Sequence, residues 1–245
     1  MDKKKDTIDK LVVFLAKRDG IDKLVKTFQY VGKLAHYNLE HKNPSLAGRF
    51  KNLEVAAGLS RKAFRTGRSL TGFNALRRTT YPDRTLQVLA ILGNGGEMVY
   101  WFFDHFLWLA RVGAIDAQYA RRLSYISAFG EGFGYIFFMT ADLILIRRGL
   151  EAEGNYERQL LELLKVENQE TGQISAQVKN IKAAISAIRM QRIMSVMSII
   201  ANLSDLFIAL ADVDPNPFVS HTITLGISGL ASAWAGWYRN WPESN

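Results

Sequence analysis

The chain has no cysteine and few prolines, and both shortages limit what it can be. Without cysteine it forms no disulfide, offers no thiolate to a metal and has no cysteine nucleophile. This absence fits a reducing compartment, or a chain that needs no covalent cross-link. The five prolines among 245 residues leave long stretches uninterrupted. No stretch alternates apolar and polar residues between hairpin turns, so we expect helices and no β-sheet.

Known chemical motifs are missing too. The sequence contains no P-loop, no His-Glu-x-x-His and no Gly-x-Ser-x-Gly, so we expect no enzymatic activity, no cofactor and no bound metal. Two glycine-rich segments, 93–96 and 130–134, look like phosphate loops. Both break the dinucleotide-binding spacing and neither follows a strand. We interpret them as positions where apolar helices pack closely.

Positive charge is concentrated in one segment. The net charge is +8 and the sequence pI is about 9.6, which favours anionic partners. Between Val55 and Pro82 there is no acid but there are six cations. On a helical projection the apolar side chains cluster on one side and most cations on the other. The residues that we expect to bind lipid are Leu59, Arg61, Lys62, Ala63, Phe64, Arg65, Arg68, Leu70, Phe73, Arg77 and Arg78.

This pattern predicts a basic amphipathic helix over about 58–78, with Arg77 and Arg78 at its frayed end. Such a helix suits the boundary between lipid headgroups and acyl chains. Each cation near an anionic membrane surface adds about 1 kcal/mol. The same pattern also fits a helix packed on a protein core with its cations in water, or one that binds an acidic partner or nucleic acid. The segment alone leaves these alternatives open.

Four apolar runs are long enough to cross a membrane. The run 218–238 has no formal charge, and as a helix it is about 31 Å long, against about 30 Å of hydrocarbon. The run 193–211 has one charge, Asp205, and is joined to the last run by a turn at 212–217. The runs 86–110 and 123–146 carry acids. We therefore predict an all-α integral membrane protein with an N-terminal amphipathic-helix region and about four membrane-embedded helices.

Small residues recur every four positions in the last run. Such stripes let transmembrane helices approach closely, so we predict that they serve self-association. The alternative is a buried helix whose small residues serve ordinary packing. The residues are Ser228, Gly229, Ser232, Ala233 and Gly236.

The acids in the two earlier runs form a second candidate site. Glu97 and Asp104 share one helical stripe, as do Glu131 and Asp142. An acid at mid-bilayer costs about 2.5–3.5 kcal/mol on insertion scales, so these side chains should face a bundle interior, water or a cation. They either line a polar path or satisfy arginines and hydroxyls in a packed bundle. The second interpretation is our default.

The predicted organisation has four parts. Residues 1–82 form a helical region that ends with the basic helix, and it begins with two amphipathic helices over about 8–15 and 24–35. Residues 83–146 hold the two acid-bearing apolar helices. Residues 147–192 form a polar helical loop, and 193–245 form a helical hairpin with a C-terminal transmembrane helix.

Several short segments occur in a characteristic order along the chain. They are RDGIDKL (18–24), FQY (28–30), SRKAFR (60–65), GRSL (67–70), DHFLWL (104–109), GISG (226–229) and AWAGWY (233–238). Each segment is weakly specific alone, but the ordered set covers nearly the whole chain apart from 147–192. This set resembles one protein family, peroxin eleven of the peroxisomal membrane, and most closely its plant-type branch.

The resemblance implies a protein of the peroxisomal membrane with both termini in the cytosol, acting in peroxisome elongation, proliferation and division. It implies that the basic amphipathic helix inserts into the outer leaflet and tubulates it. It further implies self-association, alone or with other family members. The other implied partners are a dynamin-related GTPase with its tail-anchored adaptor, and the import receptor for peroxisomal membrane proteins.

Two competing functions remain beside membrane remodelling. One is a channel for small metabolites, a second activity proposed for the family, in which the four acids would face the lumen. The other is a soluble nucleic-acid-binding protein, suggested only by the positive charge. The charge-free final run disfavours the latter, so we expect no nucleic-acid partner. The acid-bearing runs depart from a clean family pattern and leave two or four crossings open, of which we favour four.

Overall fold

The computed structural model describes residues 6–166 and 173–242, and in these ranges it is helical and without strands. The elements in chain order are α1 (Thr7–Ala16), α2 (Arg18–Leu39), α3 (Pro44–Phe64), α4 (Ser69–Arg78), α5 (Arg84–Arg111), the short 3-10 helix η1 (Ala117–Tyr119), α6 (Ala120–Val166), α7 (Gln173–Val213) and α8 (Thr222–Asn240).

Local capping explains where several helices begin. The side chain of Asp6 accepts a hydrogen bond from the backbone N–H of Asp9 at the start of α1. The Asn43 side chain caps α3 in the same way, and Pro44 occupies the first turn, where its missing N–H has no cost. Asp83 caps α5 through the N–H of Leu86. These side chains satisfy donors that a helix start leaves unpaired.

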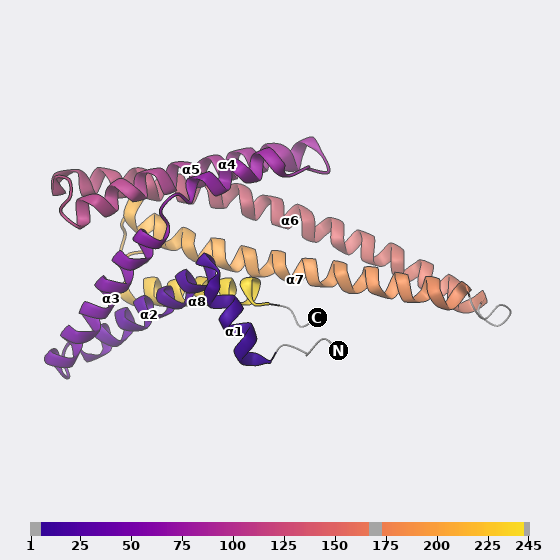
Figure 1. Cartoon of the computed structure of the whole chain (residues 1–245), viewed down its shortest axis with the longest axis horizontal. Coiled ribbons are helices and arrows are strands. Elements are labelled where there is room, and N and C mark those ends of the chain that lie inside the picture. The colour runs from indigo at the N-terminus through magenta and orange to yellow at the C-terminus, as the bar shows by residue number, and fades with distance from the viewer. Residues whose placement is uncertain (1–5, 167–172, 243–245) are drawn as a thin grey trace.

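The helices form an elongated bundle with a projecting arm (Figure 1). The helices α5 and α6 pack along each other, as do α6 and α7, while α8 lies between α7 and α2. The distal parts of α6 and α7 continue together beyond the bundle as a two-helix arm. The helix α3 packs on α2 and leads to α4, which lies along α5. We call the distal parts of α6 and α7, residues 147–166 and 173–192, the arm.

Glycines allow α5 and α6 to pack closely where they cross. A Cβ built on Gly96 lies 2.6 Å from the carbonyl oxygen of Gly130 and 2.7 Å from the backbone nitrogen of Gly134. A Cβ on Gly93 meets the ring of Phe138 at 2.7 Å. Any side chain at these places would push the helices apart. The interpretation of the two glycine-rich segments as close-packing positions is confirmed.

The two ends of the described chain lie together. The ring of Phe14 on α1 contacts Trp237 and Trp241, with ring centroids 4.5 and 5.7 Å apart. The Lys17 ammonium donates a hydrogen bond of 3.4 Å to the carbonyl oxygen of Asn240. The arm extends from the bundle on this same side (Figure 1).

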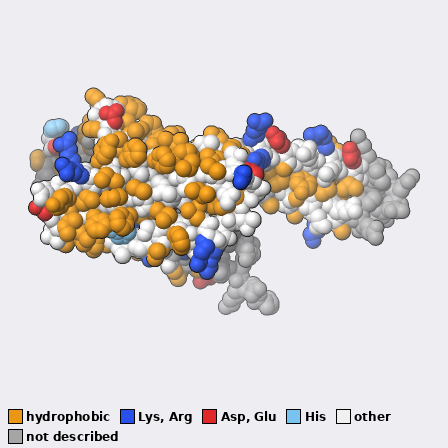
Figure 2. All heavy atoms as spheres, turned by 90° about the horizontal axis from the view of Figure 1, so that it is seen from above, with side chains coloured by type: hydrophobic (Ala, Val, Ile, Leu, Met, Phe, Trp, Pro, Cys, Tyr) orange, Lys and Arg blue, Asp and Glu red, His pale blue; other side chains and the backbone are white. Residues whose placement is uncertain are grey.

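Apolar side chains cover much of the outside of the bundle. Figure 2 shows them over the face made by α4, α5 and α6, while charged side chains gather toward the arm. A surface of this kind is stable in lipid and unstable in water. Exposed examples on α5 and α6 are Val88, Ile91, Phe102, Phe106, Phe129, Phe133, Ile136 and Leu143.

Two of the described helices, α6 and α7, are long and apolar enough to cross a membrane. With 47 residues, α6 is about 70 Å long, more than twice the thickness of a hydrocarbon layer. The prediction of an all-α membrane protein is therefore confirmed. The other two predicted runs form most of α5 and α8, and the number of crossings stays a prediction.

Two boundaries predicted from sequence are wrong. The basic helix over 58–78 is interrupted, because α3 ends at Phe64 and α4 begins at Ser69. Between them Gly67 has a φ of +73°, a conformation that glycine adopts without strain. The described residues of the predicted polar helical loop over 147–192 are helical, but they are not separate from the apolar runs, since α6 runs on to Val166 and α7 starts at Gln173. Both apolar runs simply continue as polar helices.

A charged cavity inside the helical bundle as the candidate functional site

A cavity of about 590 Å³ lies between the helices, and charged side chains line it. They come from α2, α3, α5, α6, α7 and α8 and from the turn between α3 and α4. Nine of them are Lys or Arg and eight are Asp or Glu. Charges removed from bulk water need partners, and most of these groups have one of opposite sign.

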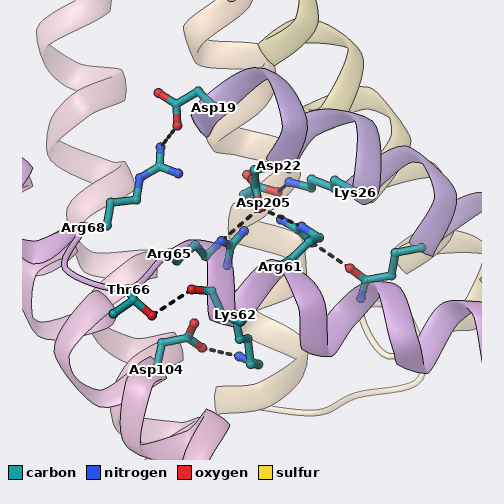
Figure 3. Close-up of polar contacts among 12 residues, drawn as sticks. Asp19, Asp22, Lys26, Arg61, Lys62, Arg65, Thr66, Arg68, Asp104 and Asp205 are labelled. Carbon is teal, nitrogen blue, oxygen red and sulfur yellow. Dashed lines mark hydrogen bonds and ion pairs between the residues drawn. The ribbon is translucent and has the colours of Figure 1, made fainter. Parts of the chain in front are cut away.

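Asp22 on α2 lies at the centre of the cluster, with a side chain only 1% exposed. Its Oδ1 accepts hydrogen bonds from the Nε atoms of Arg61 at 3.1 Å and Arg65 at 3.3 Å (Figure 3). Its Oδ2 is buried and has no hydrogen-bond partner among the described residues. Burial alone would raise the pKa of Asp22, but the two guanidinium groups hold it well below its ordinary value. Asp22 is therefore ionised at neutral pH.

Lys26 links three helices one turn further along α2. Its ammonium donates hydrogen bonds to Oδ1 of Asp205 on α7, at 2.5 Å, and to Oγ of Ser232 on α8, at 2.6 Å. The Ser232 hydroxyl donates in turn to Oδ2 of Asp205 at 2.6 Å. Every polar atom of this triad therefore has a partner, which is the condition under which buried charges are tolerated.

Two further cations of the basic segment, Lys62 and Arg68, also pair with acids of the bundle. Lys62 forms an ion pair with Asp104 on α5, and Arg68 pairs with Asp19 on α2 at 2.5 Å (Figure 3). Arg65 donates a hydrogen bond of 2.5 Å to the hydroxyl of Tyr100. Both Arg65 and Arg68 lie over the ring of Trp101, at 5.1 and 4.6 Å from its centroid.

These contacts correct the prediction for the basic helix. Arg61, Lys62, Arg65 and Arg68 do not lie free on an outer polar face, because acids far away in the sequence pair with them. A helical projection of one segment shows only the residues of that segment, so it cannot include acids from other helices. The apolar residues fare differently: Leu59 and Ala63 are half-buried, while Phe64, Leu70 and Phe73 are exposed, as are Arg77 and Arg78. Binding of lipid by any of these residues stays a prediction.

Three of the four predicted acids meet in the cavity. Glu97, Asp104 and Glu131 line it, whereas Asp142 does not. Asp142 lies instead beside Ser195 and Ser198 of α7. Its grouping with Glu131 on one polar path is therefore wrong, because the two acids point to different surroundings along α6.

The partners of these three acids differ. Asp104 is neutralised by Lys62, and Glu131 accepts a hydrogen bond of 2.6 Å from the Tyr135 hydroxyl. Glu97 has no ion pair within residues 6–166 and 173–242. Asp104 thus fits our default interpretation, an acid satisfied inside a packed bundle, while Glu97 faces the cavity space.

The predicted self-association stripe is used within the chain. A Cβ on Gly229 would lie 2.2 Å from the Tyr30 ring, and one on Gly236 would lie 2.6 Å from Cε of Lys23. Ser228, Ser232 and Ala233 are buried as well. The small residues therefore let α2 pack against α8, and no open surface for a second copy remains along them. The prediction is corrected from an intermolecular to an intramolecular contact.

Sequence reasoning missed Asp22, Lys26, Tyr100 and Asp205 as members of one site. A signal existed for Asp205, which is the single charge in an apolar run and so requires a partner. The charges of α2 carried a weaker signal, because Asp19, Asp22 and Lys26 recur at helical spacing. Nothing in the sequence identified the partners.

The site's chemistry is ion pairing and hydrogen bonding. In the part of the chain that the structure describes, no group of three or more His, Cys, Asp or Glu side chains is arranged to hold a metal ion. Together, the fold and the cavity define an all-α membrane protein with a charged interior.

Comparison with known proteins identifies the family. The family model of peroxisomal biogenesis factor 11 (PEX11) matches residues 8–241. The chain is 60% identical to peroxisomal membrane protein 11-4 of Oryza sativa over 97% of this chain and 98% of the relative. It is also 60% identical to peroxisomal membrane protein 11B of Arabidopsis thaliana, over 97% and 99% of the two chains.

A more distant relative extends the comparison beyond plants. The peroxisomal membrane protein 11 homolog of Dictyostelium discoideum is 30% identical over 96% of this chain and 95% of its own. The chain therefore belongs to the PEX11 family and is a peroxisomal membrane protein, as the resemblance implied. All three relatives are named as membrane proteins and none as an enzyme. No solved structure matches this one.

Proposed function

We propose that this protein remodels the peroxisomal membrane without covalent chemistry, and so promotes elongation, proliferation and division of the organelle. The observation that carries the proposal is the position of α4. Leu70 is 69% exposed and Phe73 is 55% exposed, and Gly72 is the one buried residue of this helix. Inserting such a helix into one leaflet expands that leaflet and favours curvature.

The end of α4 supports the same role. Arg77 and Arg78 are exposed at its C-terminus, where they can meet lipid phosphates while Leu70 and Phe73 enter the acyl region. The proposal replaces the single helix over 58–78 with α4 as the inserted element. The cations just upstream of α4, Arg65 and Arg68, pair with acids of the bundle and are not free to bind lipid in this structure.

Orientation and partners form part of the proposal. The contacts of Phe14 and Lys17 with the last turn of α8 support termini on one side of the membrane, for which we propose the cytosol. The arm extends from that side (Figure 1) and carries charged side chains on its surface (Figure 2). We propose that it receives the fission GTPase or its adaptor, and that self-association uses surfaces other than the stripe in α8.

Vesicle reshaping by the full protein tests the proposal. Purified protein is added to vesicles containing anionic lipid, and tubules are counted by electron microscopy. The substitutions Leu70→Glu and Phe73→Glu should abolish tubules, because a charge in the acyl region is strongly unfavourable. Leu161→Glu is the matched control, since Leu161 is 59% exposed but lies on the arm. Tubules from all three proteins alike would contradict the proposal.

A second function, a channel for small metabolites, is favoured by one observation. The cavity follows α5 from Glu97 to Arg111, a distance of about 20 Å along the helix axis. Glu97→Gln and Asp104→Asn should then change conductance in planar bilayers. Asp142→Asn should not, because Asp142 lies outside the cavity. Absence of conductance at any voltage would exclude this second function.

A further inference from the structure

The turn between α3 and α4 is bound to the bundle by ion pairs and hydrogen bonds, whereas α4 itself packs mainly on α5. Arg65 is bound to Asp22 and Tyr100, Arg68 is bound to Asp19, and both lie over Trp101. The helix α4 that follows packs on α5 and buries only Gly72. The position of α4 therefore depends on the ion pairs that precede it.

We propose that the contacts of Arg65 and Arg68 form a latch that holds α4 against α5, and that lipid phosphates open it. This latch consists of Arg65 and Arg68 with Asp19, Asp22, Tyr100 and Trp101. Opening it releases α4 to insert its apolar side into the lipid. The inference rests on the proposed function and adds its regulation: the closed latch is the resting state, and anionic lipid is the trigger.

The backbone on both sides of α4 permits this movement. Arg65 is the C-cap of α3, and Gly67 follows with a φ of +73° and open space where a Cβ would be. On the other side, residues 79–83 separate α4 from α5 without helical structure. Changes of φ and ψ in these two short links can reorient α4 while α3 and α5 remain helical.

Opening leaves no buried charge uncompensated. When Arg65 leaves, Asp22 keeps its hydrogen bond with Arg61, which belongs to α3 and stays in place. Asp19 is 43% exposed and is solvated by water when Arg68 leaves. Each arginine exchanges a carboxylate for a lipid phosphate, and guanidinium groups bind both anions in the same fork geometry. The two states are thus close enough in energy for lipid composition to decide between them.

The closed state is also incompletely satisfied. Arg65 shares one oxygen of Asp22 with Arg61, and the second oxygen of Asp22 is buried without a partner among the described residues. A buried polar atom without a hydrogen bond destabilises the state that contains it. The latch therefore holds α4 less firmly than the fully bonded Lys26 triad holds α2.

Disulfide trapping measures whether α4 is docked. The chain has no cysteine of its own, so the pair Gly72→Cys and Met98→Cys reports only on this contact. A Cβ on Gly72 lies 3.1 Å from Cγ of Met98, within reach of a disulfide. The full protein is oxidised in vesicles of zwitterionic lipid alone and in vesicles with increasing anionic lipid. We expect the cross-linked fraction to fall at least threefold with anionic lipid.

Two comparisons make the result specific. Asp19→Asn removes the negative charge that pairs with Arg68, so the cross-linked fraction should fall at a lower content of anionic lipid. The pair Gly132→Cys and Ala209→Cys is the matched control, because a Cβ on Gly132 lies 3.8 Å from that of Ala209 at the contact of α6 with α7. Its cross-linking should not depend on lipid. Equal trapping of the first pair in all vesicles, or no trapping in zwitterionic vesicles, overturns the latch.

The oxidised protein also separates the latch from the proposed function. If both are correct, the cross-linked protein forms no tubules and regains them after reduction. If cross-linking falls with anionic lipid but the unmodified chain never reshapes vesicles, the latch stands and the proposed function fails. If the cross-linked protein tubulates as well as the reduced one, α4 acts while docked and the latch is wrong.

Discussion

Lys26 on α2 and Asp205 on α7 form an ion pair of 2.5 Å between Nζ and Oδ1, although 179 residues separate them in the sequence. Ser232 on α8 bonds to both. The N-terminal helices are therefore joined to the apolar bundle through a charge in its interior. A pair of this kind determines which helices meet, since α2 satisfies Lys26 only in this register.

Removing one partner of this pair should destabilise the protein strongly. Asp205→Asn leaves the Lys26 ammonium buried without a counter-charge, and we expect a loss of about 3–5 kcal/mol. Thermal unfolding of the purified protein in detergent, followed by circular dichroism, measures it. The double variant Lys26→Met/Asp205→Leu should recover much of the loss, because it leaves no buried charge.

A surface pair provides the control for this prediction. The side chains of Arg147 and Glu151 are 84% and 63% exposed, so Glu151→Gln should change stability by less than about 1 kcal/mol. Equal effects of Asp205→Asn and Glu151→Gln would show that Lys26 and Asp205 are not buried together.

Neighbouring glycines on α5 should respond in opposite ways to alanine. Gly96→Ala places a Cβ against the backbone of α6, and we expect a loss of about 1–3 kcal/mol from overpacking. Gly95 has nothing within 4 Å of such an atom, so Gly95→Ala should stabilise the helix by about 0.5–1 kcal/mol. Melting temperatures of the two variants, compared with that of the wild type, test this prediction. A fall in both would mean that α5 packs differently.

The contact of α2 with α3 should weaken in acid. Burial alone would raise the pKa of Glu54, but hydrogen bonds from Lys33 and Lys51 outweigh it and hold the pKa below its ordinary value of 4.5. A carboxylate with a lowered folded-state pKa stabilises the fold at neutral pH and loses this effect as pH falls through that pKa. The stabilisation by Glu54 is therefore complete at pH 7 and begins to decline as the pH falls below about 4.5, the ordinary pKa of this side chain.

The variant Glu54→Gln isolates this effect. At pH 7 it should be less stable than the wild type by about 1 kcal/mol or less, since both lysine partners, Lys33 and Lys51, are partly exposed. The difference should shrink as the pH falls through the lowered pKa of Glu54, because both side chains are neutral once Glu54 is protonated. Unfolding curves recorded from pH 7 to pH 3 give the comparison, and a difference that persists in acid would contradict the assignment.

Gly229 distinguishes packing within the chain from association between chains. Gly229→Ala drives a Cβ into the space of the Tyr30 ring, so we expect a loss of about 1–3 kcal/mol. Tyr30→Ala removes the clash, and the two effects should be non-additive because the residues touch. Thermal unfolding measures the cycle. A change in oligomer size by light scattering without loss of stability would restore the stripe to a role between chains.

Composition and periodicity predicted the all-α class of the fold and most of its apolar helices. The helix starts at Pro44 and after Pro82 follow from proline and capping chemistry, and the close-packed glycines of α5 and α6 follow from their place in apolar runs. The interruption after Phe64 was missed, since a single glycine in a helical pattern is usually tolerated. Gly67 has a positive φ, and Arg65 and Arg68 on either side of it pair with Asp22 and Asp19, which the local sequence does not reveal.

The sequence by itself determined the class of this protein, an all-α membrane protein without cysteine chemistry, because helical period, run length and composition are properties of neighbouring residues. Pairing of the charges was decided only when α2, α3, α5, α7 and α8 came together. Which acid neutralises Arg65 or Lys26 depends on distances between residues far apart in the chain. A helical projection that treats one side as solvent therefore placed those cations outside, while the folded bundle encloses them.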